Sequence, residues 1–327
     1  MYCYNNSLGI DLSSFSLNPN KKEDIPVTVC VALLSDNRRN VVGVADRMIT
    51  AGDIEYEPPQ QKVIPLTNSI VVMTAGDSSF NTEIINEVKE FVSVQLQSDP
   101  DTWLRVADVA KKFQEAMAFL SAQKAAVSRL TPYGLDLETF ISRQSEFAPE
   151  FLDNLTAELM NFAVPTVEAI ITGVDSGGGH IFVVDNEELM CLDHLGFACI
   201  GIGQEHSSSQ LMFDCYAPDA KFPIAMFEGY TAKKRAEVAP GVGEATDMFA
   251  VVGLGAYSEI ADHVKEELER QYQNIRKSEI EVKSRTKEAW EEYVKERVQK
   301  QQQKTVSEQV PTEAAGNGDA PDNTEKV

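Results

Sequence analysis

Short apolar runs and helix-like spacing alternate along this chain, and they predict its secondary structure. Residues 27–34 (VTVCVALL) and 40–46 (NVVGVAD) are rich in β-branched residues and are separated by the polar segment SDNRR. The runs at 61–66 (QKVIPL) and 69–76 (SIVVMTAG) flank Thr67-Asn68 in the same way. Each pair has the pattern of two strands joined by a turn, so the sequence predicts two β-hairpins.

After Gly76 the apolar residues recur every three or four positions, which is the spacing of an amphipathic helix. One such pattern begins near Ser78, and a second covers about 103–130. Residues 131–162 begin with Pro and Gly breakers and then indicate two short helices. We interpret 131–162 as a helical insertion.

The second half of the chain returns to strands and then to helices. The runs VEAIITGVD, HIFVVDNEELMCL and FACIGIG predict three strands, and helices over about 207–216 and 222–238 precede a last strand, TDMFAVVG. Strands and helices come in groups rather than in strict alternation, which argues against a Rossmann-like order and favours an α+β fold. We expect a four-layer αββα sandwich, in which two antiparallel sheets pack together and helices cover both outer faces.

The two ends of the chain differ in composition from this central part. Residues 1–25 are rich in Asn, Ser and Lys and predict a flexible leader or propeptide, while 26–255 form the predicted domain. Residues 256–300 are highly charged and carry a narrow apolar stripe, which predicts a long helix suited to a protein partner or a coiled coil. The tail, 301–327, is expected to be disordered.

Charge and cysteine content narrow the classes of function. The chain has 51 acidic against 29 basic residues, a net charge of -22, which would repel nucleic-acid phosphates and anionic membranes. It has no basic start followed by an apolar run and no stretch of about 18 apolar residues, so no membrane span is predicted. Five cysteines without a CxxC pair indicate buried, reduced thiols rather than a metal or cofactor site. These features predict a cytoplasmic protein.

One group of residues in the predicted hairpins carries candidate chemistry. The run VVGVADRMITAG contains Asp46 and ends at Gly52. A lysine, Lys62, follows ten residues after Gly52, and the segment MTAG ends another fourteen residues later, at Gly76. This arrangement resembles the start of a proteasome β subunit or of its bacterial protease relative. The resemblance implies an N-terminal-nucleophile (Ntn) hydrolase fold, a peptide or protein substrate, a ring-shaped homo-oligomer, and no metal or organic cofactor.

The resemblance also implies a catalytic role for four residues. Thr28 would be the nucleophile after removal of the preceding residues, and its own α-amino group would accept the hydroxyl proton. An α-amino group titrates near pH 8, closer to neutrality than a lysine side chain, so it suits the role of base. Asp46 and Lys62 would tune this pair, and the backbone N–H of Gly76 would stabilise the oxyanion.

Several residues depart from the family pattern or leave alternatives open. Thr28 follows Val27, whereas self-processing leaders of the family usually end in glycine, and Ile202 stands where active subunits carry a serine. In the family an aspartate supports this serine, but neither Glu237 nor Asp247 stands at the matching position of this sequence. An ungapped alignment puts Cys30 at the nucleophile position, although the family's small-residue pattern favours Thr28.

Three hypotheses follow from these observations. The first is a threonine-type peptidase or amidohydrolase that uses Thr28 as its N-terminal nucleophile. The second is a non-catalytic, proteasome-like assembly or scaffold subunit that keeps its leader and contacts other proteins through residues 256–300. The third is an Ntn amidase for a small substrate, whose pocket would be closed by residues 131–162. A processed N-terminus would distinguish the first from the second.

Overall fold

The computed structural model describes residues 28–51, 54–56, 62–99, 103–186 and 188–308. The predicted leader, 1–25, lies outside the described residues. The chain divides into two structural units, one that ends at Lys265 and one that begins at Glu266.

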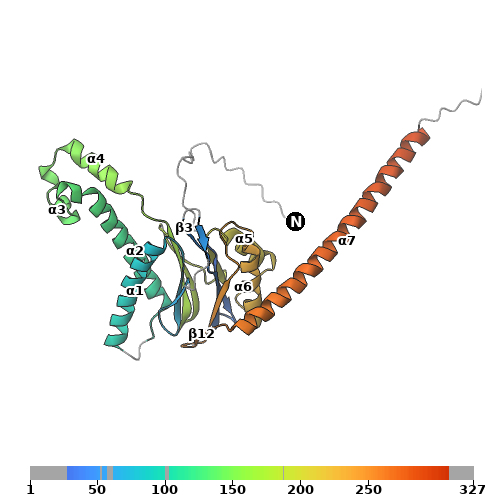
Figure 1. Cartoon of the computed structure of the whole chain (residues 1–327), viewed down its shortest axis with the longest axis horizontal. Helices are drawn as coiled ribbons and strands as arrows, with labels where there is room; N and C mark the ends of the chain where they lie inside the picture. The colour runs from blue at the N-terminus through green and yellow to red at the C-terminus, as the bar shows by residue number, and fades with distance from the viewer. Residues whose placement is uncertain (1–27, 52–53, 57–61, 100–102, 187, 309–327) are drawn as a thin grey trace, which may run out of the picture. The chain divides into compact units, whose positions relative to one another are not determined.

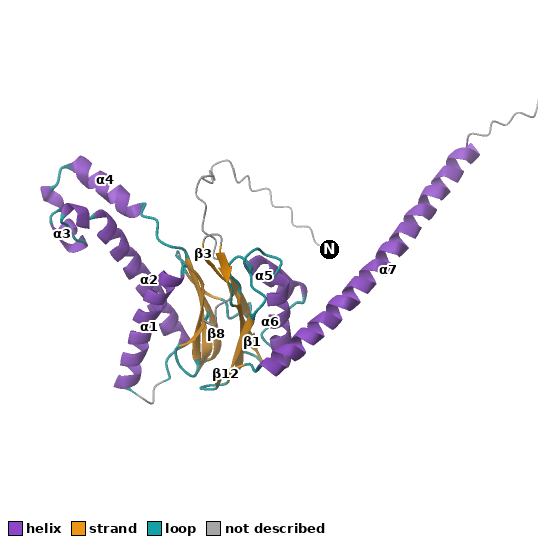
Figure 2. Cartoon of the chain, in the orientation of Figure 1, coloured by secondary structure: helices purple, strands orange, loops and turns teal. Residues whose placement is uncertain are grey.

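The fold is mixed α+β, and the strands in the described part of the chain form two five-stranded antiparallel sheets and one short hairpin (Figure 2). The first sheet has the order β10-β1-β2-β11-β12, and the second has the order β5-β6-β7-β8-β9. The first sheet contains β1 (Cys30–Ser35), β2 (Asn40–Asp46), β10 (Phe197–Ile200), β11 (Thr246–Val252) and β12 (Tyr257–Glu259). The second contains β5 (Val63–Pro65), β6 (Ile70–Gly76), β7 (Val167–Asp175), β8 (Gly178–Val184) and β9 (Leu189–Cys191). The hairpin pairs β3 (Ile49–Ala51) with β4 (Ile54–Tyr56).

Seven α-helices occur among the described residues (Figure 1). They are α1 (Ser78–Ser98), α2 (Val106–Arg129), α3 (Leu137–Ser142), α4 (Pro149–Met160), α5 (Gln204–Phe213), α6 (Phe222–Ala236) and α7 (Asp262–Glu308). The predicted helix start after Gly76 is confirmed, because the Asp77 side chain caps α1 by accepting a hydrogen bond from Phe80 N at 2.7 Å.

Two large clusters of buried apolar side chains stabilise the sheets and their neighbouring helices in the described part of the first unit. One cluster combines residues of both five-stranded sheets, including Leu34, Val41, Met73 and Ile170. The other joins the second sheet to α1 and α2, and Figure 1 shows these two helices beside that sheet. Helix α6 contacts β1 and β2 of the first sheet. Burial of these apolar surfaces is the main stabilising contribution to such a fold.

Gly43 lies in the middle of the first sheet, opposite Ala32 on β1 and Phe249 on β11. A Cβ at this position would lie 2.8 Å from Cδ1 of Phe249 and still closer to the edge of the ring. We therefore expect Gly43→Ala to lower the free energy of unfolding by about 1–3 kcal/mol, measured by urea denaturation. The double variant Gly43→Ala/Phe249→Leu should lose less than the sum of the two single changes, because the smaller side chain makes room. Additive losses would contradict this packing.

A polar cluster connects the turn between β1 and β2 to the second sheet. Arg38 binds Asp193 at 2.7 Å and donates through Nε to the carbonyl of Gly179 at 3.1 Å. The His180 ring lies between two carboxylates, with Nδ1 at 2.6 Å from Asp193 and Nε2 at 3.2 Å from Asp175. The sequence pattern gave no indication of these partners, since they come from four separate segments of the chain.

The two short helices predicted within residues 131–162 are confirmed, and this segment has a small core of its own. Residues 131–162 contain α3 and α4, and the side chains of Leu130, Phe140 and Leu155 pack together in a separate cluster. Phe140 and Phe147 stack with their ring centroids 6.0 Å apart. The insertion therefore does not depend on the main core for all of its packing.

Four short strands differ from the sequence prediction. The run HIFVVDNEELMCL forms two antiparallel strands, β8 and β9, rather than one. The hairpin of β3 and β4 was not predicted, and β12 lies in a segment assigned to the charged helix. Each of β3, β4, β9 and β12 has three residues, too few for an alternating pattern to be recognised.

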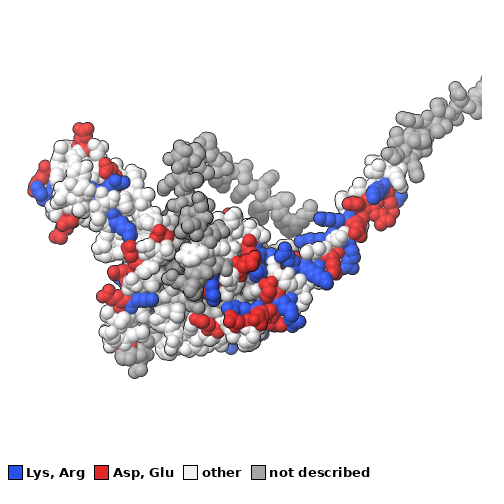
Figure 3. Space-filling view, viewed as in Figure 1, with Lys and Arg blue, Asp and Glu red and all other residues white. Residues whose placement is uncertain are grey.

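The long helix α7 begins at Asp262 and continues to Glu308. The prediction of a helix from 256 to 300 is therefore displaced at both ends, and the predicted disorder is wrong for residues 301–308. Figure 3 shows acidic and basic side chains mixed along α7, in agreement with ion pairs such as Arg270–Glu267 at 2.6 Å. None of the helices in the described part of the chain is long and apolar enough to cross a membrane.

The side-chain carboxyl of Glu228 on α6 has a strongly raised pKa. Burial, together with the nearby Asp214, raises the pKa of Glu228 to about 7. A carboxyl group with a raised pKa holds its proton more tightly in the folded state, so its contribution to stability is present below about pH 4.5 and is lost as the pH rises through about 7. We expect Glu228→Gln to raise the free energy of unfolding by about 1–2 kcal/mol at pH 8 and to change it little at pH 4.

Urea unfolding at the two pH values measures the effect of Glu228→Gln. Glu90→Gln is the matched control, because Glu90 lies exposed on α1. An equal change at pH 4 and pH 8 would show that a neutral amide acts through packing and not through the ionisation of Glu228.

Candidate functional site

The pairing of strands brings three of the predicted site residues to one place. Thr28 lies two residues before the first residue of β1, Asp46 is the last residue of β2, and Lys62 directly precedes β5 of the other sheet. The backbone N–H of Asp46 donates to the carbonyl of Val29 at 3.2 Å, which aligns the ends of β1 and β2. Residues separated by 18 and 34 positions in the sequence are thereby in contact.

The three side chains form a closed set of hydrogen bonds. The Thr28 hydroxyl donates to Oδ1 of Asp46, and the Lys62 ammonium donates to the Thr28 hydroxyl. Lys62 Nζ also lies 2.8 Å from Asp46 Oδ1. Thr28 is 1% exposed, Asp46 is 0% exposed and the Lys62 side chain is 13% exposed. A hydroxyl, a carboxylate and an ammonium group therefore meet in a site with little access to water, where their electrostatic interactions are strong.

Three backbone N–H groups also donate hydrogen bonds to the Asp46 carboxylate. Oδ1 accepts the N–H of Val29 at 3.0 Å, and Oδ2 accepts the N–H groups of Met48 at 3.1 Å and Gly243 at 3.0 Å. These charge-assisted bonds hold the carboxylate in one orientation.

The sequence analysis missed a buried lysine that supports this arrangement. Lys233 on α6 is 0% exposed, and its Nζ lies 2.6 Å from Glu237 and 2.8 Å from each of the carbonyls of Gly243 and Glu244. Burial lowers the pKa of Lys233, while the nearby Glu237 acts in the opposite direction. Lys233 thus fixes the loop whose Gly243 N–H reaches Asp46. In the sequence, Lys233 begins the basic run Lys233, Lys234 and Arg235 at the end of α6, so no pattern marks it as buried.

The turn after β10 packs directly on Thr28. Gly203 N donates to the Thr28 carbonyl at 3.2 Å, and Gly201 has a φ of +83°. A Cβ at Gly201 would lie 2.7 Å from Cγ2 of Thr28, so this close approach needs glycine. Gly201 N also donates to the Glu168 carboxylate at 2.8 Å, and burial raises the pKa of Glu168. Ile202 occupies this turn, so the turn adds no side-chain hydroxyl next to Thr28.

Gly76 lies at the end of β6, directly before the Asp77 cap of α1. Its φ is +99°, and a Cβ at this position would clash with the carbonyl group of Thr166 and lie 3.1 Å from Cα of Val167. Gly76 takes part in none of the hydrogen bonds of the Thr28 cluster. The backbone conformation at position 76 explains why glycine is found there, while the role of its N–H as an oxyanion donor stays a prediction.

Cys30, the alternative nucleophile, lies in the core between the sheets. It is fully buried, and its thiol donates to the carbonyl of Thr74 at 3.6 Å. Burial raises the pKa of the Cys30 thiol, which opposes formation of the reactive thiolate. The structure thus joins Thr28, and not Cys30, to Asp46 and Lys62. The expectation of buried cysteines is wrong for Cys191 and Cys215, which are exposed.

Comparison with known proteins adds no functional assignment. The chain matches no protein-family model and no curated protein sequence. The function is therefore inferred from the geometry around Thr28 and from the motifs that contain its partners.

Proposed function

We propose that this chain is a threonine-type Ntn hydrolase that cleaves peptide bonds in peptide or protein substrates. The observation that carries the proposal is the contact of one buried threonine hydroxyl with both a carboxylate and an ammonium group. Thr28 would become the N-terminal residue when the Val27–Thr28 peptide bond is hydrolysed.

The proposed chemistry assigns a separate task to each group. The freed α-amino group of Thr28 takes the hydroxyl proton, and the hydroxyl oxygen attacks the substrate carbonyl to form an ester with loss of the amine product. Water then hydrolyses this ester and restores Thr28. The positive charge of Lys62 favours the neutral, basic form of the amine, and Asp46 holds Lys62 in place. The N–H of Gly76 is the proposed oxyanion donor.

The proposal includes the finer architecture that the resemblance implies. We infer four layers in the order αββα, since one apolar cluster contains residues of both sheets and helices contact each sheet. We also infer a cytoplasmic homo-oligomer that uses residues 256–300 as a surface for a protein partner. The narrow apolar stripe on the long helix supports this surface.

A non-catalytic scaffold subunit is the second candidate, and two observations favour it. Ile202 supplies no hydroxyl beside Thr28, and Thr28 is 1% exposed. Glu237 and Asp247 bind Lys233 and Arg47, so neither takes the place of the missing aspartate. A scaffold subunit would keep Thr28 in peptide linkage with Val27.

Intact mass and N-terminal sequencing of the full-length chain test the choice between these functions. The hydrolase requires a chain that starts at Thr28 in the wild type and stays unprocessed in Thr28→Ala. Thr28→Ser is the matched control, since it keeps a hydroxyl and should still be processed. If wild type and Thr28→Ala both start at Met1, the N-terminal amine never forms and the scaffold function is the better account.

A further inference from the structure

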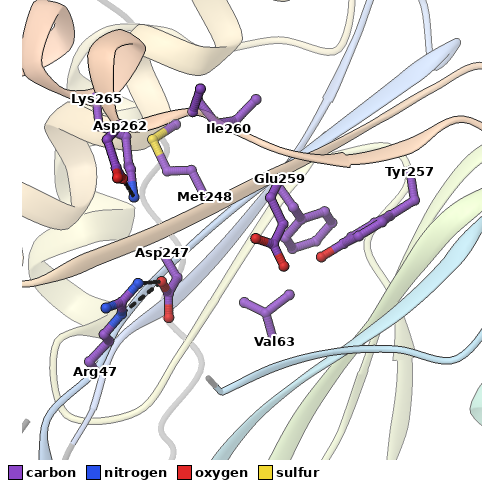
Figure 4. Close-up of a pocket in the computed structure, with 11 residues that line it drawn as sticks. Arg47, Val63, Asp247, Met248, Tyr257, Glu259, Ile260, Asp262 and Lys265 are labelled. Carbon is purple, nitrogen blue, oxygen red and sulfur yellow. Dashed lines mark hydrogen bonds and ion pairs between the residues drawn. The ribbon is translucent and has the colours of Figure 1, made fainter. Parts of the chain in front are cut away.

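A cavity of about 390 Å³ lies between the edge strands of the two five-stranded sheets. Val63 of β5 lines one side, and residues of β11, β12 and the start of α7 line the other (Figure 4). Arg47 and Val63 directly follow Asp46 and Lys62, but Thr28, Asp46 and Lys62 do not line the cavity. Its volume is within the range of small-molecule sites.

Two buried polar atoms in this cavity have no hydrogen-bond partner among the described residues. Asp247 is 5% exposed, and its Oδ1 accepts hydrogen bonds from Arg47, with Nε at 2.8 Å. Its other oxygen, Oδ2, is buried and unpaired, and so is the hydroxyl of Tyr257. Buried polar groups in folded proteins almost always have partners, so these two atoms indicate a bound group that is polar.

The charges around the cavity define the sign of this group. Arg47 is engaged by Asp247, and Lys265 lies 2.8 Å from Asp262 and 3.3 Å from the Thr246 carbonyl. Asp247 Oδ2 is therefore the acceptor in the lining that a bound group can reach without breaking an ion pair. An anion would have to displace existing ion pairs, whereas a cation can donate to Asp247 Oδ2 and leave them intact.

Apolar side chains in the lining indicate the chemistry of the remaining part of the bound group. Val63, Met248, Phe249 and Ile260 line the same cavity and suit an aliphatic stem. Figure 4 shows the Glu259 carboxylate and the Tyr257 hydroxyl extending toward the same space. Burial, with Glu259 and Asp247 nearby, raises the pKa of Tyr257, so its hydroxyl stays protonated.

We propose that this cavity binds a protonated primary amine on an aliphatic stem, with Asp247 Oδ2 as the main acceptor. The amine is either a free alkylamine or the side chain of a lysine in a peptide. This inference does not rest on the proposed hydrolase, because no residue of the Thr28 cluster takes part in the binding.

Titration of the ¹⁵N-labelled full-length chain with n-butylammonium, followed by NMR, tests the proposal. We expect saturable shifts of the Met248 and Ile260 amide signals and at least about tenfold weaker binding in Asp247→Asn, which loses the negative charge but keeps the shape of the side chain. Asp153→Asn is the matched control, since Asp153 is exposed on α4 and should bind as the wild type does. Ala261→Leu, which fills the cavity, should also weaken binding.

Two further probes identify the source of the amine and the role of its charge. N-acetyl-lysine methylamide that binds more tightly than n-butylammonium would identify a peptide side chain, and the reverse order would identify a free amine. Equal binding of n-butanol would show that the cavity takes only the apolar stem and would overturn the proposal. So would unchanged affinity in a folded Asp247→Asn, or no saturable shift with either amine.

Discussion

Thr28→Ala should abolish peptide hydrolysis by the processed protein, with a loss of at least about 10³-fold in kcat/KM. The Thr28 hydroxyl is the only nucleophilic atom that contacts both Asp46 and Lys62 among the described residues. A change to alanine removes this atom and leaves the backbone of β1 in place. The measurement is cleavage of a mixed peptide library, followed by mass spectrometry, with a chain whose N-terminus is made to begin at residue 28.

Cys30→Ala is the control for this prediction. Cys30 lies two residues further along and was the alternative nucleophile, but its thiol is buried in the core. We expect Cys30→Ala to keep hydrolysis within about threefold of the wild type, since its cost is mainly one of packing. The opposite pattern, with Thr28→Ala active and Cys30→Ala inactive, would reassign the nucleophile. No cleavage by the wild type would favour the scaffold function.

Most of the strands around the site could be predicted because they are long enough to show their pattern. β1, β2, β6 and β7 have six to nine residues, and their almost continuous apolar runs agree with burial on both faces. The contact of Thr28 with Asp46 follows from the pairing of β1 with β2, which a hairpin turn implies. The contact with Lys62 does not, because Lys62 belongs to the other sheet and a sequence does not show how two sheets meet.

The support around the site could not be predicted for the same reason. Lys233, Gly243 and Glu168 come from three distant segments, and their partners are mostly backbone groups, which leave no side-chain pattern in a sequence. In the sequence, Asp247 could be compared only with the aspartate of the family pattern, whose position it does not match. Its ion pair with Arg47 depends on the register of β11 against β2, in which Asp247 lies opposite Ala45.

Asp46→Ala should lower the free energy of unfolding by about 3–5 kcal/mol, the largest stability effect that we expect from a single change. Its carboxylate accepts hydrogen bonds from Thr28, Lys62 and the N–H groups of Val29, Met48 and Gly243. A change to alanine leaves all of these donors without their partner, and it leaves the Lys62 charge in a site with little water. Urea denaturation of the full-length chain measures the loss.

Two further variants separate the causes of the Asp46→Ala effect. Lys62→Met in the Asp46→Ala background should recover part of the loss, because it removes the unpaired charge, whereas Asp153→Ala on the exposed face of α4 should cost less than about 0.5 kcal/mol. A loss below about 1 kcal/mol in Asp46→Ala would mean that water reaches these donors and that the cluster is not closed. The hydrolase and the scaffold both require this stability effect, so it tests the geometry of the cluster, while Thr28→Ala tests its chemistry. A large loss of stability in Asp46→Ala together with an inert Thr28 would therefore show that the cluster has a structural role without the proposed reaction.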